Sequence, residues 1–218
     1  NVCYRTYDEN TKVQSFSEEI LSGAKQKIDD TAELLLNPER RGEPEINQSV
    51  KLEPEGHINL DLPEGEKAVL KLVLKIDAED INQALRSTVL SLTFDGTETV
   101  WVPAGDFFGN GYQLHPSETW YTKVSANGTM ESTWMMPYEN SASVQVHNFG
   151  EQQISMDLGV SVDDYNWKNN SMHFGSAWHE HYELNTAKDE NLENHKWHFD
   201  VNYVDLNGKG IYAGDALT

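Results

Sequence analysis

The sequence predicts an all-β fold, an antiparallel β-sandwich of jelly-roll type with one long N-terminal helix. From about residue 46 onward, short apolar runs recur and turn sequences such as Asp95-Gly96 and Asn127-Gly128 separate them. Only one long segment carries helical periodicity. No unit of about 20–50 residues repeats, which argues against a propeller or a solenoid.

The helix is expected over residues 15–36. Ser15 and Glu18 have the spacing of a capping box, and apolar residues recur at helical intervals up to Leu36. Asn37-Pro38 ends the helix, because proline disfavours the α region in the residue before it. The charged stretch 39–45 is interpreted as a linker or exposed loop.

The strands are expected after this linker, with one short helix at 77–86. Their predicted ranges are 50–52, 58–62, 68–76, 88–94, 99–102, 120–124, 130–136, 144–146, 154–162, 172–182, 197–206 and 211–217. We therefore divide the chain into 1–45, the end of a preceding sheet domain with its linking helix, and 46–218, a jelly roll. Both chain ends read as strands without partners, so we expect a longer polypeptide, with the jelly roll truncated at its C-terminus, or pairing with another chain.

Composition excludes several classes of partner. Lys and Arg number 16 against 36 Asp and Glu, a formal net charge of −20. A nucleic-acid surface needs clustered cations, so nucleic-acid binding is excluded, and anionic membrane surfaces are disfavoured for the same reason. No apolar run of about 18 residues is present, so no membrane span is expected. Neither a phosphate-binding glycine loop before a helix nor a serine nucleophile elbow occurs, and no cofactor is expected.

The strongest local signal for function follows the apolar run 99–102. Pro103 stops that run, and a loop with glycines at 105, 109 and 111 then presents Asp106, Phe107 and Phe108. Aromatic rings stack against the CH faces of a sugar, and a carboxylate accepts hydrogen bonds from its hydroxyls. The alternative is a turn aspartate whose oxygens accept from loop amides. We interpret the three side chains as saccharide-binding candidates.

Other tryptophans and carboxylates are weaker candidates. Trp134 and Trp178 are possible stacking platforms, although core packing is the commoner role, and Trp101 and Trp197 are expected in the core. Glu118 and Glu139 lie near the aromatic loop or its partner strand but are expected to be solvated surface groups.

The histidines support a competing interpretation. On a strand, His179, His181 and Glu183 would lie on one face, and two imidazoles with a carboxylate are able to hold a transition metal. This arrangement resembles the metal motif of cupins, but the glutamate spacing differs. The alternative, which we favour, is an exposed acidic edge without a metal.

Several segments resemble glycoside hydrolase family 172, formerly a domain of unknown function. The matching stretches are Trp101 to Gly111, Gly128 to Tyr138, Ser171 to Trp178 and Gly208 to Asp215, preceded by Tyr4-Arg-Thr-Tyr7 and Thr11 to Phe16. These ordered motifs run over nearly the whole chain. The resemblance implies tandem jelly rolls, oligomeric assembly and hydrolysis of fructofuranosides or arabinofuranosides.

The resemblance also implies where the catalytic groups lie. The family's two carboxylates belong to Gly- and Glu-rich motifs beyond the last strand, and those motifs do not occur in these 218 residues. We therefore expect part of a glycoside hydrolase for furanose-containing saccharides, with its paired carboxylates outside this chain. Catalytic residues are unassigned; Asp106, Phe107, Phe108, Trp134 and His173 are expected to shape the sugar pocket.

The alternatives are a non-catalytic carbohydrate-binding or assembly jelly roll and, third, the cupin-like metal enzyme. The expected partners are a saccharide and a second copy or another chain. Because polysaccharide-degrading relatives are often exported, a periplasmic or extracellular location is expected.

Overall fold

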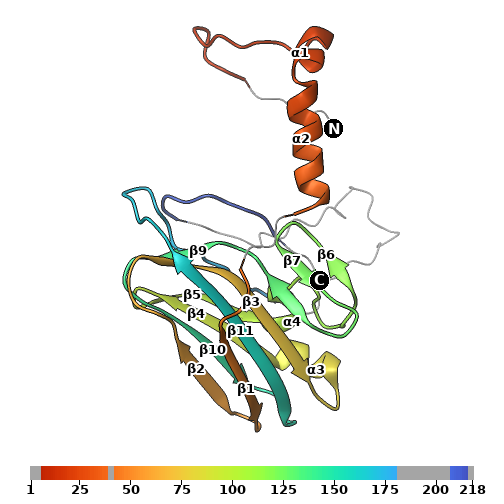
Figure 1. Ribbon diagram of the computed structural model, residues 1–218, viewed down its shortest axis with the longest axis vertical. Helices are drawn as coiled ribbons and strands as arrows, with labels where there is room; N and C mark the ends of the chain where they lie inside the picture. Colours follow the sequence, from red (N-terminus) through yellow and green to blue (C-terminus); the bar gives the residue numbers. More distant parts are fainter. Residues whose placement is uncertain (1–5, 39–41, 181–206, 216–218) are drawn as a thin grey trace, which may run out of the picture. The chain divides into compact units, whose positions relative to one another are not determined.

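The computed structural model describes residues 6–38, 42–180 and 207–215 (Figure 1). The chain separates into two compact units, Asn1–Glu39 and Arg40–Thr218. In the described residues, no helix is both long and apolar enough to span a bilayer.

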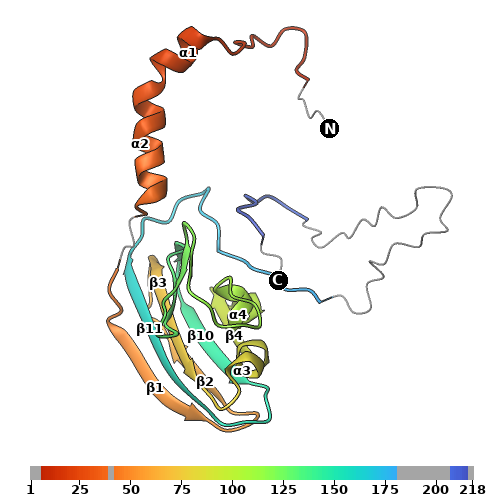
Figure 2. The same ribbon diagram turned by 90° about the vertical axis from the view of Figure 1, so that its right-hand side faces the viewer.

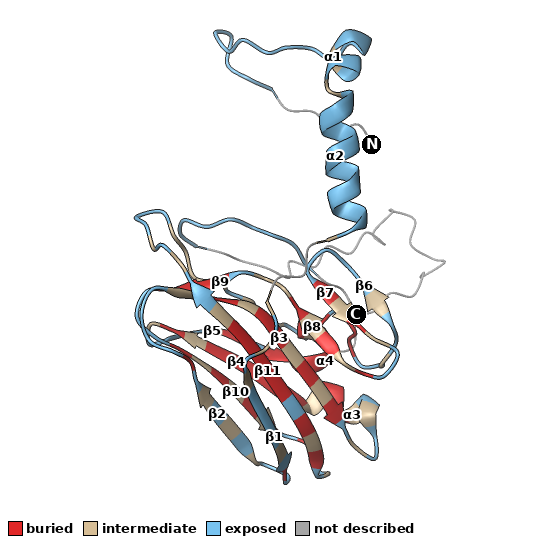
Figure 3. Ribbon diagram, viewed as in Figure 1, coloured by how far each residue is buried: buried red, intermediate tan, exposed pale blue. Residues whose placement is uncertain are grey.

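The N-terminal unit contains the expected helix in two pieces, α1 (Glu18–Gly23) and α2 (Lys25–Leu36). Ser17, rather than Ser15, caps the first piece and accepts a hydrogen bond from the Ile20 backbone N–H at 3.3 Å. The helices break at Ala24, next to Gly23, because glycine is a poor helix former. None of the helical residues is buried, as the pale blue ribbon in Figure 3 shows.

The second unit is built from two antiparallel sheets. One has the order β1 (Ile46–Leu52), β11 (Ile154–Asp164), β3 (Lys67–Asp77), β8 (Met130–Ser132), β7 (Thr122–Val124) and β6 (Ser117–Glu118), with β9 (Met136–Tyr138) also paired to β3. The other has the order β2 (His57–Asp61), β10 (Ala142–Asn148), β4 (Thr88–Phe94) and β5 (Thr97–Pro103). The two layers are visible in Figure 2, and the all-β sandwich prediction is confirmed.

The core lies between the sheets and follows from residue alternation. In β10, Val144 and Val146 are fully buried, whereas the intervening Gln145 and His147 are half-buried on the other face. Both sheets contribute large apolar side chains to one cluster, and the buried ribbons of Figure 3 mark it in red. Burial of this apolar area is the main stabilising contribution to the sandwich.

Two short helices belong to the sandwich. The helix α3 (Ile81–Ser87) begins after Asp80, whose carboxylate accepts from the Gln83 backbone N–H at 3.1 Å. The helix α4 (Ala104–Phe107) follows β5 directly and packs against α3, β4 and β5. This packing brings a residue of α3 next to the glycine-rich loop.

Residues 172–180 differ from the predicted strand 172–182. They form only a single parallel bridge, between Val100 of β5 and Ser176. The Ser176 backbone N–H donates to the Thr99 carbonyl oxygen at 2.9 Å, and the Thr99 hydroxyl donates to the Phe174 carbonyl oxygen at 2.6 Å. Strand propensity reports side-chain preference, but a ladder needs a paired backbone over its length.

Three other predicted strands differ from the structure or lie outside its described residues. Residues 211–215 form no strand, so the prediction for 211–217 is wrong over its described part, and 197–206 lies outside the described residues. The predicted strand 130–136 is split into β8 and β9, which pair with different parts of β3.

Candidate functional site

The segment 172–180 organises the candidate site, because it lies beside the edge strand β5 and contacts three separate groups of residues. His173 contacts the turn before β5, Phe174 contacts aromatic rings near α4, and Trp178 and Glu180 contact α3. His173 and Glu180 lie 78 and 94 positions away in sequence from the groups that they meet.

The glycine-rich loop after β5 is tightly folded. A Cβ on Gly105 would lie 1.7 Å from the Gly111 carbonyl oxygen, and Gly109 has φ +76°. The backbone N–H groups of Asn110 and Gly111 both donate to the Gly105 carbonyl oxygen, at 2.7 and 3.0 Å. Only glycine tolerates this closeness and this dihedral without strain, so the loop returns on itself and holds α4 in place.

Asp106 is held by an arginine that the sequence did not single out. Arg86 of α3 donates from one guanidinium nitrogen to Asp106 Oδ2 at 3.1 Å and from the other to Glu180 Oε1 at 2.9 Å. The Asp106 side chain is 9% exposed, whereas those of Arg86 and Glu180 are each 32% exposed. The planar guanidinium therefore joins two carboxylates that are distant in sequence.

Two tryptophans border this ion-pair network. The Arg86 guanidinium lies 5.3 Å from the centre of the Trp178 ring, within cation–π range, and the Trp178 and Trp101 rings lie 6.5 Å apart. Trp101 is 44% exposed, so the expectation that it lies in the core is wrong. Its side chain points to the outer face of β5 because Val100 and Val102 occupy the inner face. We call these five residues (Arg86, Trp101, Asp106, Trp178 and Glu180) the Arg86 centre.

Phe107 and Phe108 lie in the core rather than on a surface. Phe108 is fully buried and Phe107 is 8% exposed, and the two rings meet edge to face at 5.1 Å. Phe107 also meets Phe174 edge to face, at 6.4 Å. Both rings are therefore packed in the core, and their stacking against a sugar stays a prediction.

Trp134 is half-buried within a run of rings that ends at the surface. The Tyr121 ring stacks on the Trp134 ring at 3.5 Å, and the centre of the Phe174 ring lies 5.6 Å from that of Trp134. Tyr121 also meets Trp120, and these two rings are 36% and 37% exposed. The exposed stacking surface here is therefore Trp120 and Tyr121, which sequence reasoning did not select.

His173 lies beside a carboxylate of the β4–β5 turn, and its hydrogen bond to a sugar stays a prediction. Its Nε2 lies 2.8 Å from Asp95 Oδ2, and its ring stacks on Phe94 at 6.0 Å and meets Trp167 at 5.1 Å. The structure therefore places His173 at the β4–β5 turn, where it anchors the segment 172–180. Within the described residues, the side-chain contacts of His173 are with Asp95, Phe94 and Trp167, none of which is a predicted site residue.

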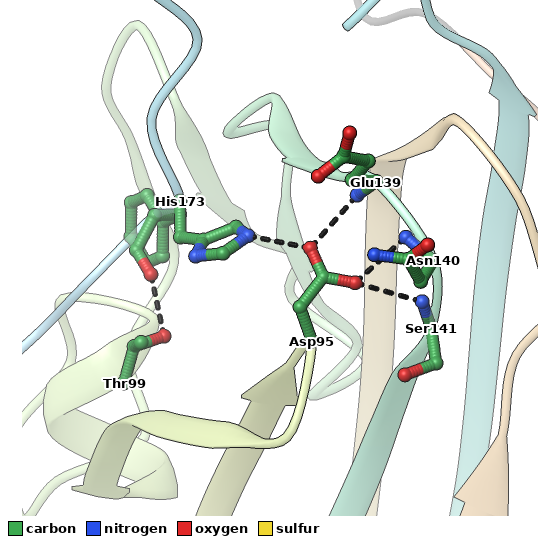
Figure 4. A network of polar contacts seen from close by, with 7 residues as sticks. Asp95, Thr99, Glu139, Asn140, Ser141 and His173 are labelled. Carbon is green, nitrogen blue, oxygen red and sulfur yellow. Dashed lines mark hydrogen bonds and ion pairs between the residues drawn. The ribbon is translucent and has the colours of Figure 1, made fainter.

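Asp95 is the most heavily bonded carboxylate of this region (Figure 4). Besides His173, it accepts from the backbone N–H groups of Glu139 at 2.9 Å, Asn140 at 2.7 Å and Ser141 at 2.9 Å. Burial opposes the charged form, but these hydrogen bonds outweigh it and lower the pKa of Asp95 to about 2. The sequence predicted only a hairpin turn at Asp95. Its left-handed backbone (φ +48°) and its four hydrogen bonds are found only in the folded structure.

The remaining candidates do not gather into a site. The Glu118 side chain is half exposed and lies 3.5 Å from Lys123 Nζ, and Glu139 is exposed. His179 is exposed, while His181 and Glu183 lie outside the described residues. Within the described part of the chain, no three His, Cys, Asp or Glu side chains are grouped as metal ligands.

Comparison with known sequences places this geometry in a family. The profile described as GH172 domain-like matches residues 44–159, more than half of the chain. The chain belongs to the GH172 domain-like family. The match extends from just before β1 into β11, so this GH172-like region contains both sheets together with Arg86 and Asp106. A search of curated proteins found no match.

Proposed function

We propose that this GH172-like chain is part of a glycoside hydrolase that acts on furanose-containing saccharides, fructofuranosides or arabinofuranosides. The observation that supports this most is the family match over residues 44–159, which is that of a glycoside hydrolase family. The proposal goes further than the match, because it names the sugar class and the part of the molecule that receives it.

The Arg86 centre is the proposed wall of the sugar site. Trp101 offers an exposed ring for stacking, and the guanidinium of Arg86 offers donors beside two carboxylate acceptors. Polar hydroxyls and apolar CH faces of one sugar ring match such a mixture of groups. Arg86 fixes the positions of both carboxylates, which reduces the conformational entropy lost on binding.

The acid and the nucleophile are proposed to come from elsewhere. Glycoside hydrolysis needs two carboxyl groups on either side of the scissile bond, one of which gives a proton to the leaving oxygen. Asp106 and Glu180 are both engaged by Arg86, which suits a positioning role. We therefore place the catalytic pair outside residues 1–218, in a longer polypeptide or a neighbouring subunit, and with it propose oligomeric assembly and export to the periplasm or cell exterior.

The test is turnover of aryl arabinofuranosides and fructans by the full-length protein. Arg86→Ala is expected to lower kcat/KM at least about tenfold, because a charged hydrogen-bonding group contributes about 1.5–3 kcal/mol. Lys75→Ala, on the outer face of the seven-stranded sheet, is the matched control and should leave kcat/KM unchanged. Equal activity of both variants would remove the Arg86 centre from the proposal.

A second candidate function is non-catalytic carbohydrate binding by the same fold. The engagement of Asp106 and Glu180 by Arg86 favours it, because binding needs no proton donor. Absence of turnover in the full-length protein, together with retained saccharide binding, would establish this alternative.

A further inference from the structure

The outer face of the four-stranded sheet presents polar side chains in register across all four strands. Trp101 of β5 lies opposite Ser91 of β4, Ser91 opposite Gln145 of β10, and Gln145 opposite Asn59 of β2. Strands lie about 4.8 Å apart, so this outer row spans about 14 Å from Trp101 to Asn59. It begins at the Arg86 centre and runs away from it.

The neighbouring row on one side is also polar. Thr93 lies opposite Ser143 and Ser143 opposite Asp61, so hydroxyl groups flank the outer row between β4 and β2. On the other side, the His147 ring stacks on Phe149 at 3.7 Å and meets the His57 ring at 5.5 Å. Phe149 is 43% exposed and lies 6.3 Å from Trp101, which extends the aromatic end of the row.

Several of these polar groups lack a partner in the described part of the chain. The side chains of Thr93, Ser143 and Gln145 are half-buried and make no hydrogen bond with the described residues. His147 Nε2 is buried and likewise makes none, and the nearest carboxylate oxygen, of Glu55, lies 3.9 Å away. The polar atoms of Thr93, Ser143 and Gln145 are not among the buried ones, so their donors and acceptors are open to a ligand that offers both.

The charges of this face favour a neutral ligand. Asp61 accepts from Asn59 at 2.8 Å, and Glu98 accepts from Ser91 at 2.5 Å, so two carboxylates lie at the rim with their own donors. No Lys or Arg occupies the outward positions of the four strands, and the whole chain is strongly acidic. An anionic polymer or acidic peptide would be repelled, whereas a polyhydroxyl chain is not.

We infer that this outer row is an extended binding strip for a neutral oligosaccharide. One sugar stacks on Trp101, within the Arg86 centre. The following units hydrogen-bond to Gln145 and Asn59, with Thr93 and Ser143 at their side. Ser91 is buried and bonded to Glu98, so it acts as the floor of the strip. The inference rests on the proposed function only for the kind of sugar, since binding along the strip requires no hydrolysis.

Calorimetric titration of the chain with fructan- and arabinan-derived oligosaccharides of one to about five units tests the strip. The affinity is expected to rise with ligand length up to about three or four units. The double variant Asn59→Ala/Gln145→Ala should bind the longer ligands about tenfold more weakly, because each lost hydrogen bond lowers affinity by about two- to tenfold. Its affinity for the single sugar should be unchanged.

Asn47→Ala/Gln48→Ala is the matched control, because it removes two exposed amides from β1 in the seven-stranded sheet. It should bind like the unmodified chain, and thermal unfolding of both double variants verifies that they are folded. Affinity independent of ligand length, or a strip variant that binds like the control, overturns the inference. So does a dimer that the strip variant converts to monomer without any effect of sugar, since the face would then be a protein interface.

The two proposals fail in different ways. Length-dependent binding without turnover by the full-length protein leaves the strip in place and removes the hydrolase proposal. Turnover that persists in the strip variant, with no length dependence in either protein, removes the strip alone.

Discussion

The strand β5 has an aspartate next to each of its ends, and the two surroundings differ. Asp95, in the turn before β5, accepts three backbone N–H groups and faces His173. Asp106, in the short helix α4 after β5, shares the guanidinium of Arg86 with Glu180, near the exposed Trp101. The Asp95 carboxylate joins loops to one another. Asp106 belongs to the Arg86 centre, whose Arg86 and Glu180 side chains are partly exposed to solvent.

The comparison teaches that a conspicuous motif and an accessible site need not coincide. The glycines of the loop after β5 are needed for its fold, and its two phenylalanines fill the core. The exposed rings come instead from β5 itself and from residues 120–121. Variants at both ends of β5 are able to separate these structural and binding roles.

The largest expected effect is at the buried rings. Phe108→Ala should lower the free energy of unfolding by about 3–5 kcal/mol, because a fully buried ring is lost and a cavity remains. Denaturant unfolding followed by circular dichroism measures this loss. Phe149→Ala removes a ring that is 43% exposed and should cost less than about 2 kcal/mol. Similar losses in both variants would contradict the assignment of Phe108 to the core.

The next effect is at Asp95. Asp95→Ala should lower the free energy of unfolding by about 2–4 kcal/mol, since three backbone N–H groups and His173 lose their acceptor together. Glu64→Ala, at an exposed carboxylate, is the control and should change the free energy of unfolding by less than about 0.5 kcal/mol. If Asp95→Ala is as stable as the control, the hydrogen-bond network of Figure 4 does not stabilise the fold.

A related effect is the dependence of stability on pH. The pKa of Asp95 falls from 3.8 to about 2 on folding, so its contribution is present above pH 3.8 and is lost as pH falls toward 2. The size is about 2 kcal/mol, at 1.36 kcal/mol for each unit of pKa. Urea unfolding between pH 5 and 2 should show this loss in the unmodified chain and a smaller one in Asp95→Asn. Parallel curves for the two proteins would rule out the lowered pKa.

The smallest expected effect is at the partly open end. Arg86→Ala should lower the free energy of unfolding by about 1–2 kcal/mol, because Asp106 loses a guanidinium while Arg86 itself is 32% exposed. Arg86→Lys keeps the charge but cannot bridge two carboxylates with one planar group, so it should recover only part of the loss. A loss as large as that of Phe108→Ala would mean that the Arg86 centre is primarily structural.

Much of the fold was predictable because its signals are local. Alternation in β10 and the Asp95-Gly96 turn between β4 and β5 are properties of neighbouring residues. The helix in the N-terminal unit was also predictable, although its break at Ala24 and its cap at Ser17 were not. The segment 172–180 was predicted as a strand because its composition favours one, while its single bridge to β5 depends on which backbone lies beside it.

The candidate site was less predictable, because its members are far apart in sequence. Asp106 was selected for its two phenylalanine neighbours, whereas the residues that it meets are distant: Arg86 is 20 positions before it, and Glu180 is 94 positions after Arg86. Trp101 was assigned to the core because tryptophan is usually buried, and its exposure follows from the direction in which β5 faces.

By itself, the sequence determined the class of fold, the acidic character of the surface and the positions of the sharp turns, because composition, periodicity and glycine placement act over a few residues. Only the tertiary structure decided which acid lies beside which cation and which rings face outward. The pairing of Arg86 with Glu180, and of His173 with Asp95, requires β5 and the segment 172–180 to lie side by side. The pairing of Arg86 with Asp106 requires α3 to pack against α4. Such contacts depend on the folded backbone, since no spacing in the chain brings those side chains together.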